Sequence, residues 1–218
     1  MNHIQMKIGS IIVTRSKSCH VKTLHTILKL NILCIQNGHK NDISFVNDDP
    51  YQKADAIQAH MKTCDRILFI DFGIQIDEES LKEVMKPYEG IGCVVFPGVT
   101  EGIDWNMFKK KVNGNVNEPT EQLGLNFDTS VDKKVSDNVW TVNETSSRAW
   151  FMNCKNVSKH LKDRKTDHIK VPPQMKVMFK KFKDNGVKIY AFTAAKLVMT
   201  YGHECISNIL NAAGVKAN

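Results

Sequence analysis

One carboxylate, Asp71, directly follows a run of apolar residues in the segment RILFIDFGIQIDEESL, residues 66–81. The apolar run, residues 67–70, is short enough for a buried strand. A carboxylate is costly to bury without a partner, and open α/β sheets bind ligands outside the carboxyl ends of their strands. Asp71 is therefore a candidate for ligand or metal binding, with the capping of a turn before Gly73 as the alternative.

Polar residues also follow two other apolar runs. Thr14 and Arg15 follow residues 8–13, and the run NILCIQ, residues 31–36, ends on Gln36 and is followed by Asn37. If both runs are parallel strands, their polar ends meet Asp71 at one edge of the sheet. Such a series of strand ends is not what a simple capping role for Asp71 predicts.

The elements that must position these residues alternate between short apolar runs and amphipathic segments. Asn47, Asp48 and Asp49 precede Pro50 as the start of a helix, with a cap and a proline at its first position. Residues 113–138 are polar, without periodicity, and are expected to be irregular. Strands are expected at residues 8–13, 31–36, 42–46, 66–70, 92–96, 140–142, 149–153 and 187–192, and helices at 19–30 (capped by Ser18), 50–62, 79–86, 105–112, 174–184 and 206–213. This order predicts an α/β protein with a mostly parallel central sheet and helices on both faces.

Composition excludes several classes of protein. The 218 residues are 42% hydrophobic and 24% charged, as in ordinary globular proteins. No apolar run reaches the roughly 18 residues of a membrane span, and the start of the chain does not resemble a secretory signal. The six cysteines form no CxxC pair, which is typical of a reducing compartment. We therefore expect a cytoplasmic protein without a membrane span.

The positive charge is concentrated late in the chain. The net charge is +7, and residues 155–188 carry eleven Lys or Arg against three Asp. Such a basic face attracts polyanions, but no helix-turn-helix, RRM, KH or zinc-finger motif accompanies it. We therefore do not expect nucleic-acid binding. Neither GxGxxG nor GxxxxGK[ST] occurs, which disfavours a dinucleotide-binding Rossmann domain and a P-loop NTPase.

The layout, from Thr14-Arg15 through RILFID to the late NGVKIY and His203, resembles the GT-A family of nucleotide-sugar-dependent glycosyltransferases. It looks most like the small transferases encoded by chloroviruses, which would place it in the host cytoplasm. The resemblance is strongest over residues 8–81. It implies one GT-A-like, Rossmann-like domain over residues 1–218, with a nucleotide-binding half (1–98) and an acceptor and donor-sugar half (99–218).

The resemblance also implies a set of nucleotide-sugar contacts. Thr14 and Arg15 would contact the nucleotide, and NILCIQNG resembles the strand whose amide or acidic end faces the base. RILFID resembles the strand that leads into the family's DxD motif. Small polar residues before Ala149 could contact the donor sugar. The residues expected to bind the donor are therefore Thr14, Arg15, Gln36, Asn37, Arg66, Asp71, Ser147 and Arg148.

For the metal, the resemblance places Asp71 and His203 as ligands of Mn²⁺ or Mg²⁺. A divalent cation that bridges two phosphates neutralises charge on the leaving diphosphate, and carboxylates are suitable ligands for it. This chain departs from the family motif because Gly73 stands where a second acid is expected. Either Asp71 holds the metal with waters, or Asp77 folds back to help.

A catalytic base is needed if the reaction inverts the sugar. The family's acidic pair near the late helix is missing here, and Asp167 and Glu144 are the candidates. The expected reaction is transfer of a sugar, from a UDP-sugar in the first instance, to a glycan or glycoprotein acceptor. The alternatives are a sugar-phosphate nucleotidyltransferase and a basic α/β module that binds nucleic acid or another polyanion.

Overall fold

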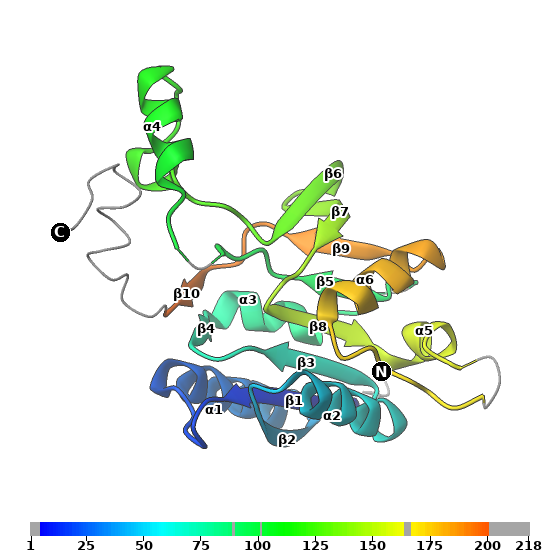
Figure 1. Ribbon diagram of the computed structural model, residues 1–218. Coiled ribbons are helices and arrows are strands. Elements are labelled where there is room, and N and C mark those ends of the chain that lie inside the picture. Colours follow the sequence, from blue (N-terminus) through cyan, green and yellow to red (C-terminus); the bar gives the residue numbers. More distant parts are fainter. Residues whose placement is uncertain (1–4, 89, 101, 164–166, 201–218) are drawn as a thin grey trace.

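The computed structural model describes residues 5–88, 90–100, 102–163 and 167–200 of the chain (Figure 1). The strands are β1 (Lys7–Thr14), β2 (Lys40–Asn47), β3 (Arg66–Ile70), β4 (Ile74–Ile76), β5 (Cys93–Val95), β6 (Thr129–Ser136), β7 (Val139–Thr145), β8 (Ala149–Asn153), β9 (Ile189–Phe192) and β10 (Leu197–Met199). The helices are α1 (Val21–Gln36), α2 (Pro50–Thr63), α3 (Glu78–Lys82), α4 (Trp105–Asn113), α5 (Cys154–Val157) and α6 (Met175–Asp184), with short 3₁₀ turns at Glu83–Met85, Thr120–Gln122 and Ser158–His160.

An 8-stranded sheet in the order β2-β1-β3-β8-β5-β9-β7-β6 forms the centre of the molecule. Strands β1, β2, β3, β5, β6 and β9 run in one direction, and β7 and β8 run in the other. This confirms the predicted α/β class with a mostly parallel sheet. Strand β8 lies between β3 and β5, so the sheet is continuous across residue 98, and the division into two halves stays a prediction.

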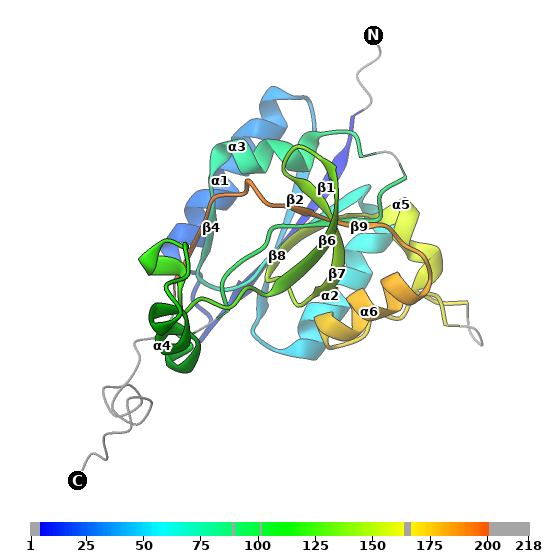
Figure 2. The ribbon, with the colours of Figure 1, turned by 90° about the horizontal axis from the view of Figure 1, so that it is seen from above.

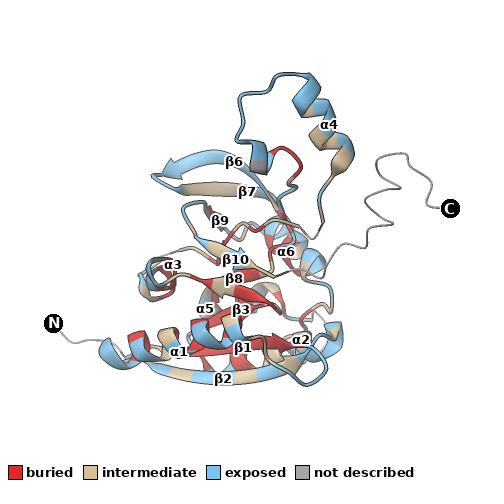
Figure 3. Ribbon diagram, turned by 90° about the vertical axis from the view of Figure 1, so that its left-hand side faces the viewer, coloured by how far each residue is buried: buried red, intermediate tan, exposed pale blue. Residues whose placement is uncertain are grey.

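Helices cover both faces of the sheet, as predicted (Figure 2). On one face, Ile27 and Leu30 of α1 and Leu81 of α3 pack in a buried apolar cluster with alternate residues of the central strands. On the other face, Ile57 of α2 and Met178 of α6 belong to a second such cluster. The buried residues concentrate in β1, β3 and β8, whereas β6 and α4 are largely exposed (Figure 3).

The predicted strand at residues 31–36 is wrong, because these residues form the second half of α1. The buried positions of this helix include Thr23, Ile27, Leu30 and Cys34, spaced three and four residues apart, so the helical stripe continues through the supposed strand. No glycine or proline interrupts it. The helix is also capped by His20 rather than Ser18, since His20 Nδ1 accepts a hydrogen bond from Lys22 N at 3.2 Å.

The prediction that residues 113–138 are irregular is wrong in part. The segment contains β6, which forms an antiparallel hairpin with β7. The strand is almost wholly exposed and its pairing with β7 is interrupted by register shifts, so its sequence shows no apolar alternation. Asn138 turns the hairpin with a φ of 62°. None of the helices among the described residues is long and apolar enough to cross a membrane.

Candidate functional site

The carboxyl ends of β1, β2 and β3 lie side by side. The parallel register places Thr14 opposite Asn47, and Ile12 opposite Ile70. The residues that leave these strands therefore emerge at one edge of the sheet, as the sequence predicted for Thr14 and Asp71. The neighbour of Thr14 is Asn47 rather than Gln36, because β2 is the strand that the sequence placed at residues 42–46.

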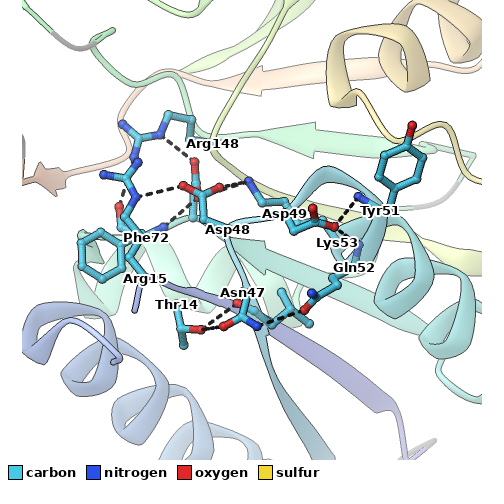
Figure 4. Close-up of polar contacts among 12 residues, drawn as sticks. Thr14, Arg15, Asn47, Asp48, Asp49, Tyr51, Gln52, Lys53, Phe72 and Arg148 are labelled. Atoms are coloured by element: carbon cyan, nitrogen blue, oxygen red, sulfur yellow. Dashed lines mark hydrogen bonds and ion pairs between the residues drawn. The ribbon is translucent and has the colours of Figure 1, made fainter. Parts of the chain in front are cut away.

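Five charged residues meet at this edge, and we refer to them as the strand-end cluster (Figure 4). Arg15 Nε lies 2.9 Å from Asp48 Oδ2, and Arg148 Nε lies 2.9 Å from Asp71 Oδ2. Lys53 of α2 pairs with Asp48 Oδ1, and its Nζ lies 3.9 Å from Asp71 Oδ1. Lys53 thus connects the two carboxylates, and the cluster joins the ends of all three strands with α2 and the β7–β8 turn.

The cluster has an excess of positive charge. Arg15, Lys53 and Arg148 oppose two carboxylates, and the side chains of Lys53 and Asp71 are only 15% and 14% exposed. Burial by itself would raise the pKa of Asp48, but hydrogen bonds and charge from Lys53 and Arg15 hold that pKa below its ordinary value. Asp48 is therefore ionised at neutral pH, and the three cations leave one positive charge for a ligand to balance.

An aromatic ring covers one side of the cluster. The guanidinium of Arg15 lies 5.1 Å from the centroid of the Phe72 ring, and His20 meets the same ring edge-on at 5.6 Å. Arg148 also donates from Nη2 to the carbonyl of Phe72 at 3.1 Å. These contacts fix the orientation of Arg15 and Arg148 in the absence of a ligand.

Sequence reasoning missed Asp48 and Lys53. The signal was present in Asn47-Asp48-Asp49-Pro50, which was interpreted only as the start of a helix. Asp49 does cap α2, since its Oδ1 accepts from Tyr51 N at 3.0 Å and from Gln52 N at 2.9 Å. Asp48 makes no such contact and instead joins the cluster.

Two predicted binding residues, Thr14 and Ser147, hold the backbone beside the cluster. Thr14 Oγ1 donates to the carbonyl of Val46 at 2.9 Å, which ties the end of β1 to β2. Ser147 is buried, and its Oγ lies 3.1 Å from the carbonyl oxygen of Phe96 and 2.8 Å from that of Ala149. Ser147 therefore holds the turn that presents Arg148.

Gln36, Asn37 and Arg66 lie at the opposite edge of the sheet, away from the cluster. Asn37 caps the end of α1 through its Nδ2, 2.8 Å from the carbonyl oxygen of Leu33. Arg66 begins β3; it is buried, donates to the carbonyls of Val84 and, at 2.9 Å, Lys86, and burial lowers its pKa. The structure does not bring these three residues together with Asp71. Arg66 stands at the amino end of β3, and the segment ending at Gln36 is a helix that runs back along the sheet.

The two predicted bases also lie outside the cluster. Asp167 has an 83% exposed side chain and pairs with Lys162 at 2.8 Å. Glu144 pairs with Lys176 at 2.6 Å, and this pair lines hollows of about 380 Å³ and about 210 Å³. The hydrogen bond and charge of Lys176 lower the pKa of Glu144.

A second carboxylate, Asp128, lines the smaller hollow and was not singled out from the sequence. Its Oδ1 accepts from Gly98 N at 3.1 Å and from Thr129 Oγ1 at 2.8 Å. Its Oδ2 is buried and has no hydrogen-bond partner among the described residues. Burial raises the pKa of Asp128, although its hydrogen bonds and the charge of Arg148 act against that rise. A buried carboxylate with a raised pKa is a candidate for proton transfer.

The described surroundings of Asp71 do not form a divalent-cation site. Its two carboxylate oxygens face Arg148 and Lys53, and Asp77 caps α3 by accepting from Ser80 N at 3.2 Å instead of folding back. Gly73, with a φ of 76°, has no side chain that could bind a metal. His203 and the helix predicted at residues 206–213 lie outside the described residues. The donor set that is described suits an anion better than Mn²⁺ or Mg²⁺.

No protein-family model matches this chain, and no curated protein matches its sequence. Among solved structures, it is similar to GalNAc-T7 with UDP, GalNAc and Mn²⁺, at 6% identity and a TM-score of 0.46 over 96% of this chain. The chain spans 48% of the length of that protein. It is also similar to the inositol-1-phosphate CTP transferase from T. maritima, at 9% identity and a TM-score of 0.48, over 94% of each chain. Both TM-scores lie below 0.5, so neither likeness carries a statement about function.

Proposed function

We propose that the protein is a glycosyltransferase that moves a sugar from a nucleotide-diphosphate sugar, with UDP-sugar as the expected donor, to a glycan or glycoprotein acceptor. The observation that carries this proposal is the convergence of Arg15, Lys53 and Arg148 at the carboxyl ends of three adjacent strands. Ligands of open α/β sheets bind at this position, and guanidinium groups pair well with phosphates.

The diphosphate of the donor would bind across the cluster. Asp48 and Asp71 hold the three cations in place beforehand, so little reorganisation is needed when a phosphate arrives. As the bond between the sugar and the diphosphate breaks, negative charge develops on the leaving diphosphate. Arg15, Lys53 and Arg148 are positioned to stabilise that charge, which lowers the barrier to transfer.

The acceptor would enter the hollow of about 210 Å³ that Asp128 and Glu144 line. Residues 146–148 connect the hollow to the cluster. At one end of this segment Ser146 N donates to the carbonyl of Asp128 at 2.8 Å, and at the other end the carbonyl of Arg148 accepts from Asp71 N at 2.9 Å. Asp128 or Glu144 would accept the proton of the acceptor hydroxyl. Asp167 remains a weaker candidate, since its carboxylate is exposed beside Lys162.

Transfer of a nucleotide to a sugar phosphate is the second candidate. Such an enzyme needs a turn after the first strand that brings main chain and a cation to the phosphates, and glycine usually supplies it. Here the turn contains no glycine, but Ser16 and Lys17 adopt the left-handed backbone conformation, with φ of 50° and 60°. Two backbone hydrogen bonds between Arg15 and Ser18 close the turn. The basic turn therefore fits this reaction as well.

Calorimetric titration tests whether a nucleotide binds, and the product released separates the two functions. We expect UDP or GDP to bind the full chain, and Arg148→Ala to weaken that binding. Each titration is run in EDTA and again with Mn²⁺, because His203 is a further ligand candidate for a metal. Release of UDP from a UDP-sugar indicates sugar transfer, whereas release of pyrophosphate from a nucleoside triphosphate and a sugar phosphate indicates the second candidate. The proposal fails if no nucleoside diphosphate binds under either condition.

A further inference from the structure

A histidine and a cysteine face each other beneath β1 and β2, away from the strand-end cluster. His60 and Cys64 lie one turn apart at the end of α2, and both are buried. The distance between His60 Nδ1 and Cys64 Sγ is 3.4 Å. A zinc ion binds sulfur at about 2.3 Å and imidazole nitrogen at about 2.0–2.1 Å. Two such ligands of a tetrahedral ion lie about 3.5 Å apart, so the observed pair is already spaced for it.

Asp42 of β2 supplies a third ligand from a different element. A carboxylate oxygen of Asp42, a ring nitrogen of His60 and Sγ of Cys64 all lie within 4.8 Å of one another. The side chain of Asp42 is 47% exposed, and its Oδ2 lies 3.3 Å from Lys7 Nζ. It can therefore rotate toward the buried pair without disturbing the core.

The orientation of the imidazole is fixed by a second contact. His60 Nε2 lies 2.7 Å from Ser44 Oγ. If Nε2 carries the proton and donates to Ser44, the lone pair of Nδ1 faces Cys64 and Asp42. Metal-binding histidines are held in this way by a partner on the other ring nitrogen.

A glycine leaves room for the side chains of His60 and Cys64. Gly9 pairs with Asp42 in the sheet. A Cβ at this position would lie 2.6 Å from His60 Nδ1 and 3.0 Å from Cys64 Sγ. Glycine weakens a strand interior and often marks a close approach by another group. Here it makes room for both ligand atoms at the point where an ion would sit.

We propose that Asp42, His60 and Cys64 form a zinc site that is separate from the proposed transferase site and joins the end of α2 to β2. Binding replaces the thiol proton of Cys64 with the metal and releases that proton to solvent. The thiolate and the Asp42 carboxylate balance the charge of Zn²⁺, and water would complete the tetrahedral shell on the side where Asp42 is exposed.

Cobalt is the probe, because a thiolate bound to Co²⁺ gives an intense near-ultraviolet band that carboxylate or imidazole ligands alone do not give. The full chain is reduced, freed of metal with a chelator and titrated with Co²⁺. We expect one Co²⁺ per chain with this band, and its loss when Zn²⁺ is added. Absence of the band in the unmodified chain overturns the proposal.

Variants then identify the ligands. Cys64→Ser should abolish the band, whereas Cys19→Ser, which removes a partly buried thiol next to His20 in the chain, should retain it. Asp42→Asn changes an exposed side chain and keeps the protein measurable if Cys64→Ser does not fold. It should weaken Co²⁺ binding, and Ser44→Ala should weaken it about tenfold or more. Asp71→Asn should have no effect, which separates this site from the proposed donor site. A band that persists in Cys64→Ser, or unchanged affinity in Asp42→Asn, overturns the assignment.

Discussion

Arg148 Nε donates to Asp71 Oδ2 at 2.9 Å, although the two residues lie 77 positions apart in the chain. The pairing of β8 with β3 brings the two residues together, because β8 runs antiparallel beside β3 and places Ala149 opposite Ile70. The turn before β8 therefore reaches the end of β3. Asp71, which the sequence suggested as a metal ligand, is thus paired with a guanidinium, and its role as a metal ligand stays a prediction.

Arg148→Ala removes one of the three cations of the strand-end cluster. A hydrogen bond to a charged group contributes about 1.5–3 kcal/mol, so we expect nucleoside diphosphates to bind about 10- to 100-fold more weakly. The measurement is calorimetric titration with UDP and GDP. Lys134→Ala is the control for charge alone, because it removes an exposed cation of β6 that pairs with Asp137. Equal losses in the two variants would contradict a specific role for Arg148.

Asp48→Asn should remove part of the pH dependence of stability. The pKa of Asp48 is lowered in the folded state, so its ionised form stabilises the fold above the unfolded pKa. This contribution declines as the pH falls from the ordinary value of 3.8 through the lower folded pKa. The urea midpoint of the unmodified chain should fall more steeply in this range than that of the variant. Parallel curves would show that Asp48 is not coupled to Lys53 and Arg15.

Asp128→Asn and Glu144→Gln separate the two candidate bases. Loss of a general base costs about 10²- to 10⁴-fold in rate, and we expect that loss in one variant at saturating donor, with donor affinity retained in both. Asn keeps the acceptor oxygen for Gly98 and Thr129.

The folded pKa of Asp128 is raised, so the protein should gain stability as the pH falls through that pKa towards the ordinary value of 3.8. Asp128→Asn should lack this gain.

Turnover that is unchanged in both Asp128→Asn and Glu144→Gln would exclude both bases.

Arg66→Met should lower the free energy of unfolding and leave nucleotide binding unchanged. The substitution leaves the carbonyls of Val84 and Lys86 without their donor, and each unsatisfied group costs about 1–3 kcal/mol. Chemical denaturation measures the stability, and titration with UDP measures the binding. Lys188→Ala, at an exposed position, is the control. A selective loss of UDP binding would restore Arg66 to the predicted donor site.

Local patterns in the sequence were sufficient for much of the fold. The apolar runs at residues 8–13 and 66–70 predicted β1 and β3, and the cap and proline before residue 51 predicted α2. They succeeded because burial of consecutive residues and helix capping are short-range properties. The run at residues 31–36 failed because an apolar stripe on a buried helix and an apolar strand look alike over six residues.

The sequence by itself determined that polar residues follow buried strands, and so it predicted that Thr14, Arg15 and Asp71 lie at strand ends. Only the tertiary structure decided what these residues meet. The pairing of β3 with β8 brought Arg148 to Asp71, and the packing of α2 brought Lys53 between Asp48 and Asp71. It likewise brought His60 and Cys64 to Asp42. Contacts between distant segments depend on strand order and helix packing, which no local pattern specifies.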